Sequence, residues 1–91
     1  MGKRGKRNLV VIDRCVRLLM VNDTGLTSDQ LKGKLSEITT RYPSANAISN
    51  ILTKVPGVEE VGTMRIPGGS LLPIWKVTNH ESWRAWREKQ A

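Results

Sequence analysis

The stretch YPSANAISNILTKVPGVE, residues 42–59, decides the fold that we predict from this sequence. Tyr42-Pro43 breaks any preceding helix, and Ser44 can cap a new one. Pro56-Gly57 ends that helix, and the apolar spacing after Gly57 changes from about 3.6 residues toward 2. The stretch therefore predicts a short amphipathic helix that leads into a strand. Its inward apolar residues are Ile48, Ile51, Leu52 and Val55.

Two further helices are predicted before this stretch. Residues 8–22 place their polar side chains on one side of a helical period, which predicts a helix with a wide buried face, capped by Asn8. Gly25 can take the left-handed conformation in the turn after it. Thr27-Ser28-Asp29-Gln30 has the form of a capping box, so a second helix is expected from about residue 28 to 41.

A hairpin and a last helix are predicted after it. Residues 58–66 and 72–78 have strand periodicity and are joined by Pro67-Gly68-Gly69-Ser70, which favours a β-hairpin. Thr78-Asn79-His80-Glu81 is a second candidate capping box and would open a short C-terminal helix. The three tryptophans are expected to be core residues or a cover for the first helix, rather than a stacking surface for single-stranded nucleic acid. They are Trp75, Trp83 and Trp86.

The composition limits the chain to one small basic domain. It has 91 residues, 15 Lys plus Arg against 8 Asp plus Glu, and a formal charge of +7. A chain of this length buries about 60–65% of its unfolded surface, so one compact core must supply the stability. We divide it into a disordered basic arm at 1–7, a domain at 8–78 and a helical extension at 79–91. The four basic residues of the arm are Lys3, Arg4, Lys6 and Arg7.

The sequence also argues against several functional classes. A single cysteine forms no intramolecular disulfide, and with His80 as the only histidine we expect neither a zinc site nor another cofactor. Cys15 is expected to be a buried structural thiol, and a reducing, intracellular setting fits best. The apolar run at 9–12 is cut by Asp13 and Arg14, so we expect no membrane span. No constellation of catalytic residues is found, and we expect no enzyme.

The order of these elements resembles that of the winged helix-turn-helix family of DNA-binding domains. The resemblance covers about residues 8–78 and implies an α+β fold with a three-helix core, a β-hairpin wing and, here, a short C-terminal helix. It rests on three short motifs: Gly25-Leu26-Thr27-Ser28, Ser44-x-x-x-Ile48-Ser49-x-Ile51-Leu52 and Val55-Pro56-Gly57-Val58-Glu59.

In that family the third helix usually enters the major groove of DNA. Carried over by position, the resemblance implies base-edge contacts from Asn46, Ser49 and Asn50. Asn can pair bidentately with adenine, and Ser suits several base edges. Thr53 and Lys54 lie further along the same predicted face and are expected to reach phosphates.

The wing and the helix start supply further candidate contacts with the DNA backbone. Ser44, with the free amides at the start of the third helix, could hold a phosphate. Arg65 stands beside the hairpin tip formed by Gly68 and Gly69, and is the wing cation placed to contact a phosphate or probe a groove. Arg41 is a further candidate for DNA contact. It would contribute if it formed one continuous positive face with Lys54, Arg65 and the root of the arm.

The basic arm is expected to contribute much of the affinity. Such arms can follow a DNA groove when a folded domain holds them nearby. Four phosphate contacts would give a salt slope of about −3.6, since each contributes about −0.9. The weakly charged Asn and Ser face of the third helix would then supply the selectivity.

These observations predict a small protein that binds double-stranded DNA, as a transcriptional regulator or as an accessory factor of a virus or mobile element. The alternative is an interaction module that docks on a transcription or replication protein. It is favoured by the third helix, which carries only Lys54 as a charge on its exposed face, and would be favoured further if the cations were scattered. A homodimer through the first and last helices is also open, because the first helix has more apolar face than the next two helices need.

Overall fold

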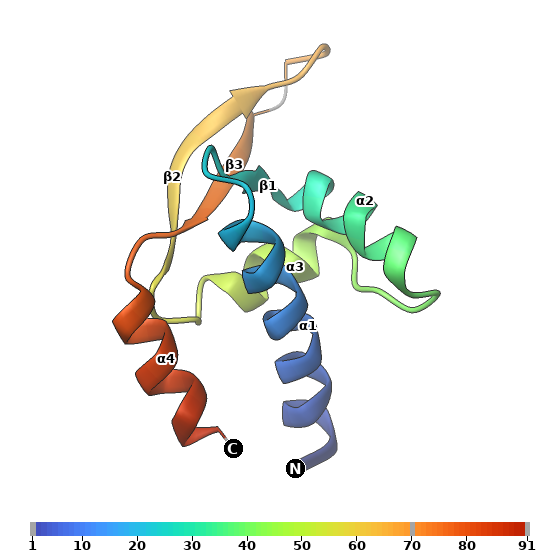
Figure 1. Cartoon of the computed structure of the whole chain (residues 1–91). Coiled ribbons are helices and arrows are strands. Elements are labelled where there is room, and N and C mark those ends of the chain that lie inside the picture. Colours follow the sequence, from blue (N-terminus) through green and yellow to red (C-terminus); the bar gives the residue numbers. More distant parts are fainter. Residues whose placement is uncertain (1, 70, 91) are drawn as a thin grey trace.

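The computed structural model describes residues 2–69 and 71–90, with the side chains of 9–69 and 71–90. These residues form four helices and a three-stranded antiparallel sheet of order β1-β3-β2 (Figure 1). The predicted α+β class is confirmed. The elements are α1 (Gly2–Met20), β1 (Leu26–Thr27), α2 (Ser28–Ile38), α3 (Ala45–Leu52), β2 (Val58–Arg65), β3 (Leu71–Val77) and α4 (His80–Lys89).

Helices α2, α3 and α4 start at side-chain caps, as the sequence predicts. The Gln30 backbone N–H donates to Thr27 Oγ1 over 3.1 Å, and the Thr27 N–H donates back to Gln30 Oε1 over 2.9 Å. This completes the predicted capping box of α2. Ser44 Oγ accepts the Ala47 N–H at the start of α3, over 3.2 Å. The cap of α4 is Asn79 rather than Thr78, one residue later than the predicted box.

Two helix boundaries differ from the sequence prediction. The backbone of α1 is helical from Gly2, where we predict a disordered arm at 1–7 and a cap at Asn8. Lys and Arg are good helix formers, so the helix can continue through this segment. Helix α2 ends at Ile38 rather than near residue 41, because Thr39 adopts an extended conformation, which β-branched residues favour.

Strand β1 is an element that the sequence prediction missed. Leu26 pairs with Trp75 and Thr27 pairs with Ile74, so β1 lies on the side of β3 opposite β2. Gly25 precedes it with φ +86°, the predicted left-handed turn. The short strand joins the helices to the sheet.

The β2–β3 hairpin is anchored at one end only. Val58 and Val77 pair at the buried end, and Arg65 pairs with Leu71 at the far end. A register shift between Glu60 and Gly62 interrupts the ladder. Beyond Val58 every residue of β2 is exposed, so the hairpin projects from the helices (Figure 1).

The core lies where α1, α2 and α3 meet the base of the sheet. Cys15 is fully buried there, as predicted, and burial raises the pKa of its thiol to about 11. Trp75 and Trp83 are core residues, and Trp86 packs against them from a half-buried position, so the predicted structural role of the tryptophans is confirmed. The largest fully buried side chains are Leu31, Leu35, Ile48, Leu52, Val16, Thr27 and Cys15.

Helix α4 is held against both α1 and the turn after α3. Arg87 Nε and Nη2 donate to the two carboxylate oxygens of Asp13 over 2.8 and 3.0 Å, and the hydrogen bond raises the pKa of Arg87. The backbone N–H groups of Thr78 and Asn79 both donate to the Gly57 carbonyl. Figure 1 shows α4 alongside the first half of α1. No helix in the described residues is long and apolar enough to cross a membrane.

Candidate nucleic-acid interface

Helix α3 has one face in the core and one face in solvent. Ile48 and Leu52 are fully buried on the inward face. Asn46 and Asn50 are exposed on the other, one helical turn apart. Side chains at this spacing lie next to each other on a helix surface. The structure therefore brings together two of the three residues that the sequence proposes for base-edge contacts.

Ser49, the third candidate, points toward the core. Its Oγ lies 2.5 Å from Ser28 Oγ, and Trp75 Nε1 donates to Ser28 Oγ over 3.0 Å. These hydrogen bonds join α3, α2 and β3 through a polar link that is buried at Trp75 and Ser28 and partly exposed at Ser49. The predicted outward orientation of the Ser49 hydroxyl is wrong, because the residue stands at the border between the two faces and its hydroxyl contacts Ser28 on α2.

The candidate phosphate contacts lie at both ends of α3. Thr53 and Lys54 are exposed just after the helix, and the Thr53 hydroxyl donates to the Asn50 carbonyl over 2.7 Å. Ser44 is exposed at the start, where its oxygen already caps the helix. Residues 38–58 contain no Asp or Glu, so α3 and its flanking loops carry no repulsive charge of their own toward a phosphate backbone.

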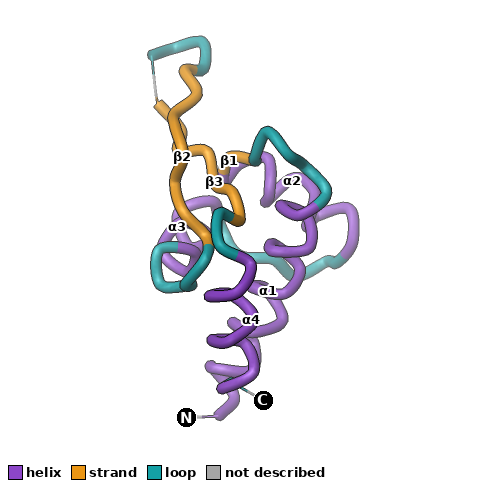
Figure 2. The backbone as a smooth tube through the Cα atoms, turned by 60° about the vertical axis from the view of Figure 1, so that its left-hand side comes forward, coloured by secondary structure: helices purple, strands orange, loops and turns teal. Residues whose placement is uncertain are grey.

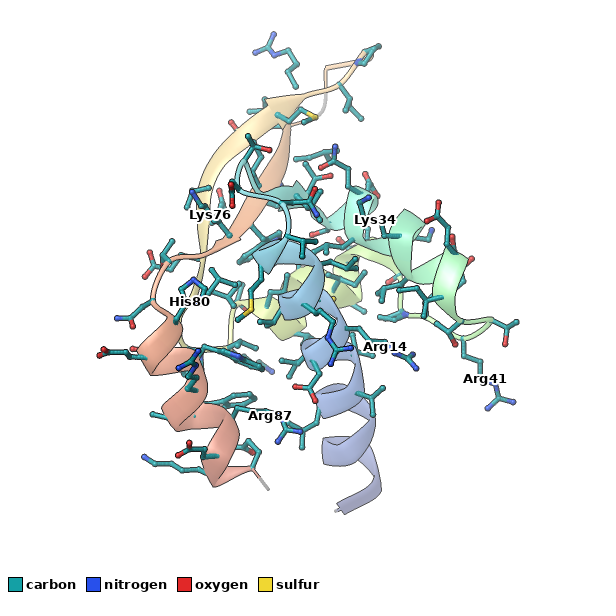
Figure 3. All side chains as sticks on the ribbon, viewed as in Figure 1. Arg14, Lys34, Arg41, Lys76, His80 and Arg87 are labelled. Carbon is teal, nitrogen blue, oxygen red and sulfur yellow. The ribbon has the colours of Figure 1, made fainter. Side chains whose placement is uncertain are left out.

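The other cations do not gather around α3. Arg41 lies with Arg14 beside Val10 and Tyr42, in a hollow between α1 and the loop after α2. Figure 3 shows Arg41 reaching outward beyond the end of α2. Arg65 is exposed at the far end of the hairpin, a separate location in a molecule that extends over 41 × 29 × 21 Å. The structure therefore does not give a continuous face joining Arg41, Arg65 and Lys54.

The part of α1 that follows the basic segment lies near Lys54. Leu9 and Ile12 of α1 line the same groove as Asn50 and Lys54. The side chains of Lys3, Arg4, Lys6 and Arg7 lie outside the described residues, but their backbone continues α1 from this groove. Two of the four expected positive sites, Lys54 and the root of the basic segment, are thus neighbours.

The hairpin tip has the backbone geometry of a tight turn. Gly68 and Gly69 have φ of +105° and +94°, which glycine adopts readily. The Gly69 N–H donates to the Ile66 carbonyl over 3.1 Å. The tip is exposed, so its glycines leave the backbone open to close approach by a partner.

The hairpin exposes three large apolar side chains that the sequence does not single out. Val61, Met64 and Leu71 are 49, 39 and 56% exposed. Met64 pairs with Leu72, and Leu71 pairs with Arg65, so Met64 and Leu71 lie on opposite faces of the hairpin. Strand periodicity cannot tell that this half of the hairpin extends beyond the helices. Both faces of the outer hairpin therefore expose apolar side chains.

Comparisons of the chain with protein-family models, with curated proteins and with solved structures found no match. The candidate interface therefore depends on the geometry alone. In the described part of the chain, no group of three or more His, Cys, Asp or Glu side chains is arranged to hold a metal ion.

Proposed function

We propose that this chain is a winged helix-turn-helix protein that binds duplex DNA, as a transcriptional regulator or as an accessory factor of a virus or mobile element. Helix α3 would be the reading helix, the β2–β3 hairpin the wing, and the basic first turns of α1 a third contact. The element order α1-β1-α2-α3-β2-β3 and the sheet order β1-β3-β2 are compatible with this fold.

The observation that carries the proposal is the exposed pair Asn46 and Asn50 on a helix whose other face is fully buried. Two adjacent amides on a helix surface can each donate to and accept from an adenine edge. Lys54 adds a phosphate contact at the end of the same helix. No acidic residue lies between residues 38 and 58 to oppose it.

The arrangement along the molecule also supports the proposal. In Figure 2, α3 lies along the edge between the hairpin and the first turns of α1, and α2 lies toward the other side. A duplex along this edge would meet the hairpin, α3 and the basic segment in turn. The segment at residues 3–7 carries four of the 15 basic residues, so it would supply much of the salt-dependent affinity.

The test is a fluorescence-anisotropy titration of labelled duplex DNA at two salt concentrations. We expect binding tighter than ~10⁻⁴ M at low salt, the level of non-specific binders. Replacing Lys3, Arg4, Lys6 and Arg7 by Gln should weaken binding and reduce the magnitude of the salt slope by up to about 3.6. Lys34→Ala on α2 is the control, because Lys34 lies beside Thr24 and Gly25, away from α3. Binding weaker than this level, or an unchanged slope, would contradict the proposal.

A second candidate function is docking of the hairpin on another protein of transcription or replication. It is favoured by the exposed apolar side chains of Val61, Met64 and Leu71, and by the hairpin charges, in which Glu59 and Glu60 offset Arg65 and Lys76. The lack of a continuous face joining Arg41, Arg65 and Lys54 favours it as well. This candidate predicts that Asn50→Ala and Arg65→Ala leave DNA affinity unchanged. The DNA titration therefore separates the two candidates.

A further inference from the structure

A groove lies between α1, α3 and α4, with a volume of about 270 Å³. Its walls are apolar. They come from all three helices and from the turn after α3: Leu9, Ile12, Ile51, Val55 and Trp86. Sites for small molecules are typically apolar clefts of roughly 300–1,000 Å³ with a few polar groups. The volume of this groove lies just below that range.

The polar groups of the groove favour an anion. Asn50, Lys54 and Gln90 complete its lining, and Lys54 is the one ionisable group among the described lining side chains. The two amides offer further hydrogen-bond donors, and an ammonium group attracts a carboxylate over several ångströms. Asp13 follows Ile12 on α1, and its carboxylate is already paired with Arg87.

We propose that this groove binds a small molecule with an apolar body and a carboxylate group. The carboxylate would lie at Lys54, with Asn50 or Gln90 donating to it, and the apolar body would lie against Trp86 and Ile51. The small volume and the walls from three helices suit one small molecule better than a protein segment. The half-buried Trp86 leaves part of its ring free for this contact.

The position of the groove implies regulation, an implication that rests on the proposed DNA binding. Asn50 and Lys54 belong both to the groove and to the α3 face proposed to contact DNA. A carboxylate at Lys54 would neutralise a phosphate contact and occupy the space beside Asn50. DNA and the small molecule would therefore compete, and a ligand at ten times its Kd would weaken DNA binding about tenfold.

The test of the site uses 3-phenylpropionate, with 3-phenylpropan-1-ol and 3-phenylpropylamine as matched neutral and cationic probes. Binding is followed without DNA by the indole N–H signal of Trp86 in ¹H-¹⁵N spectra. We expect a saturable shift, with the carboxylate bound at least ~5-fold more tightly than the alcohol, the factor for about 1 kcal/mol of charge attraction. The amine should bind most weakly.

Lys54→Met is the informative variant, because Lys54 is exposed and its replacement leaves the core intact. It should remove the preference for the carboxylate while alcohol binding persists, and Lys34→Met should change nothing. Absence of a saturable Trp86 shift with the carboxylate, equal affinities for the three probes, or an unchanged preference in Lys54→Met would overturn the site.

Competition is measured separately, by adding 3-phenylpropionate to the protein–DNA complex. We expect the probe to weaken DNA binding by the wild-type protein. In Lys54→Met the probe should no longer have this effect. Unchanged DNA affinity at saturating probe would overturn the proposed overlap. A protein that binds the probe but no DNA would contradict the DNA-binding proposal and leave the groove assignment standing.

Discussion

The two faces of α3 differ in what holds them in place. Ile48 and Leu52 are fully buried on one face, and Ser49 beside them is hydrogen-bonded to Ser28. On the other face, Asn46 and Asn50 are exposed, and no side-chain hydrogen bond is found for them among the described residues. The inward face is therefore explained by folding, whereas the outward face is free to serve a partner. The following substitutions test this division.

The largest effect is expected from Leu52→Ala, which removes a fully buried side chain from the inward face. Truncation of a buried leucine typically costs about 2–5 kcal/mol, because apolar burial is lost and a cavity forms. Thr53→Ala, at the next position and exposed, should change the free energy of unfolding by about 0.5 kcal/mol or less. Urea denaturation measures both. Similar losses at the two positions would show that the faces do not differ as described.

The turn after α3 is expected to be nearly as sensitive. Gly57 has φ +86°, and a Cβ there would overlap the Asn79 carbonyl oxygen and stand 2.9 Å from the Trp83 backbone nitrogen. Gly57→Ala should cost more than about 2 kcal/mol, from the left-handed conformation and the clash with α4. Gly33→Ala is the matched control, because a Cβ there meets nothing within 4 Å. It should stabilise α2 by up to about 1 kcal/mol. Opposite signs in thermal denaturation are the expected outcome.

The polar link beneath α3 should matter less than the apolar core. Ser28→Ala removes the acceptor of Trp75 Nε1 and the partner of Ser49. A buried donor left without a partner costs about 1–3 kcal/mol. Chemical denaturation should show this loss, with a shift of the Trp75 indole N–H signal. An unperturbed indole signal would mean that the link does not hold Trp75.

The thiol of Cys15 predicts a pH dependence of stability. Its pKa is raised from 9.0 to about 11, so the folded state disfavours the thiolate. Above about pH 9 the unfolded chain loses this proton and the folded chain keeps it. Stability should therefore fall between about pH 9 and 11, by about 1.4 kcal/mol per pH unit, and level off above. Cys15→Ala should flatten this part of the profile. If Cys15→Ala keeps the same slope of stability against pH, other groups cause the pH dependence.

The sequence predicts the elements that local chemistry specifies. The caps at Thr27 and Ser44, the left-handed Gly25 and the hairpin all depend on residues close together in the chain. Strand β1 was missed because two residues carry no periodicity, and its pairing partner Trp75 lies 49 residues after Leu26. The start of α1 was missed because a run of Lys and Arg reads equally as a solvated tail or as helix.

The candidate site, like the fold, could be predicted from the sequence only where local periodicity determines it. Periodicity places Asn46 and Asn50 correctly on the outward face of α3. It cannot decide Ser49, since a step of about 100° from each neighbour puts that residue between the faces. Only its contact with Ser28, 21 residues earlier in the chain, turns it inward. The groove beside Trp86 could not be predicted from the sequence, because its walls come from three helices that meet only in the folded chain.

The most direct test of the two faces compares Ser49→Ala with Asn50→Ala, neighbouring residues assigned to opposite roles. Each variant is measured for its free energy of unfolding and for its affinity for duplex DNA. Ser49→Ala should lose about 0.5–1.5 kcal/mol of stability and keep its DNA affinity, as expected for a lost internal hydrogen bond. Asn50→Ala should keep its stability and lose about 1–3 kcal/mol of binding to its preferred sequence. DNA affinity that falls with Ser49→Ala but not with Asn50→Ala would contradict the account.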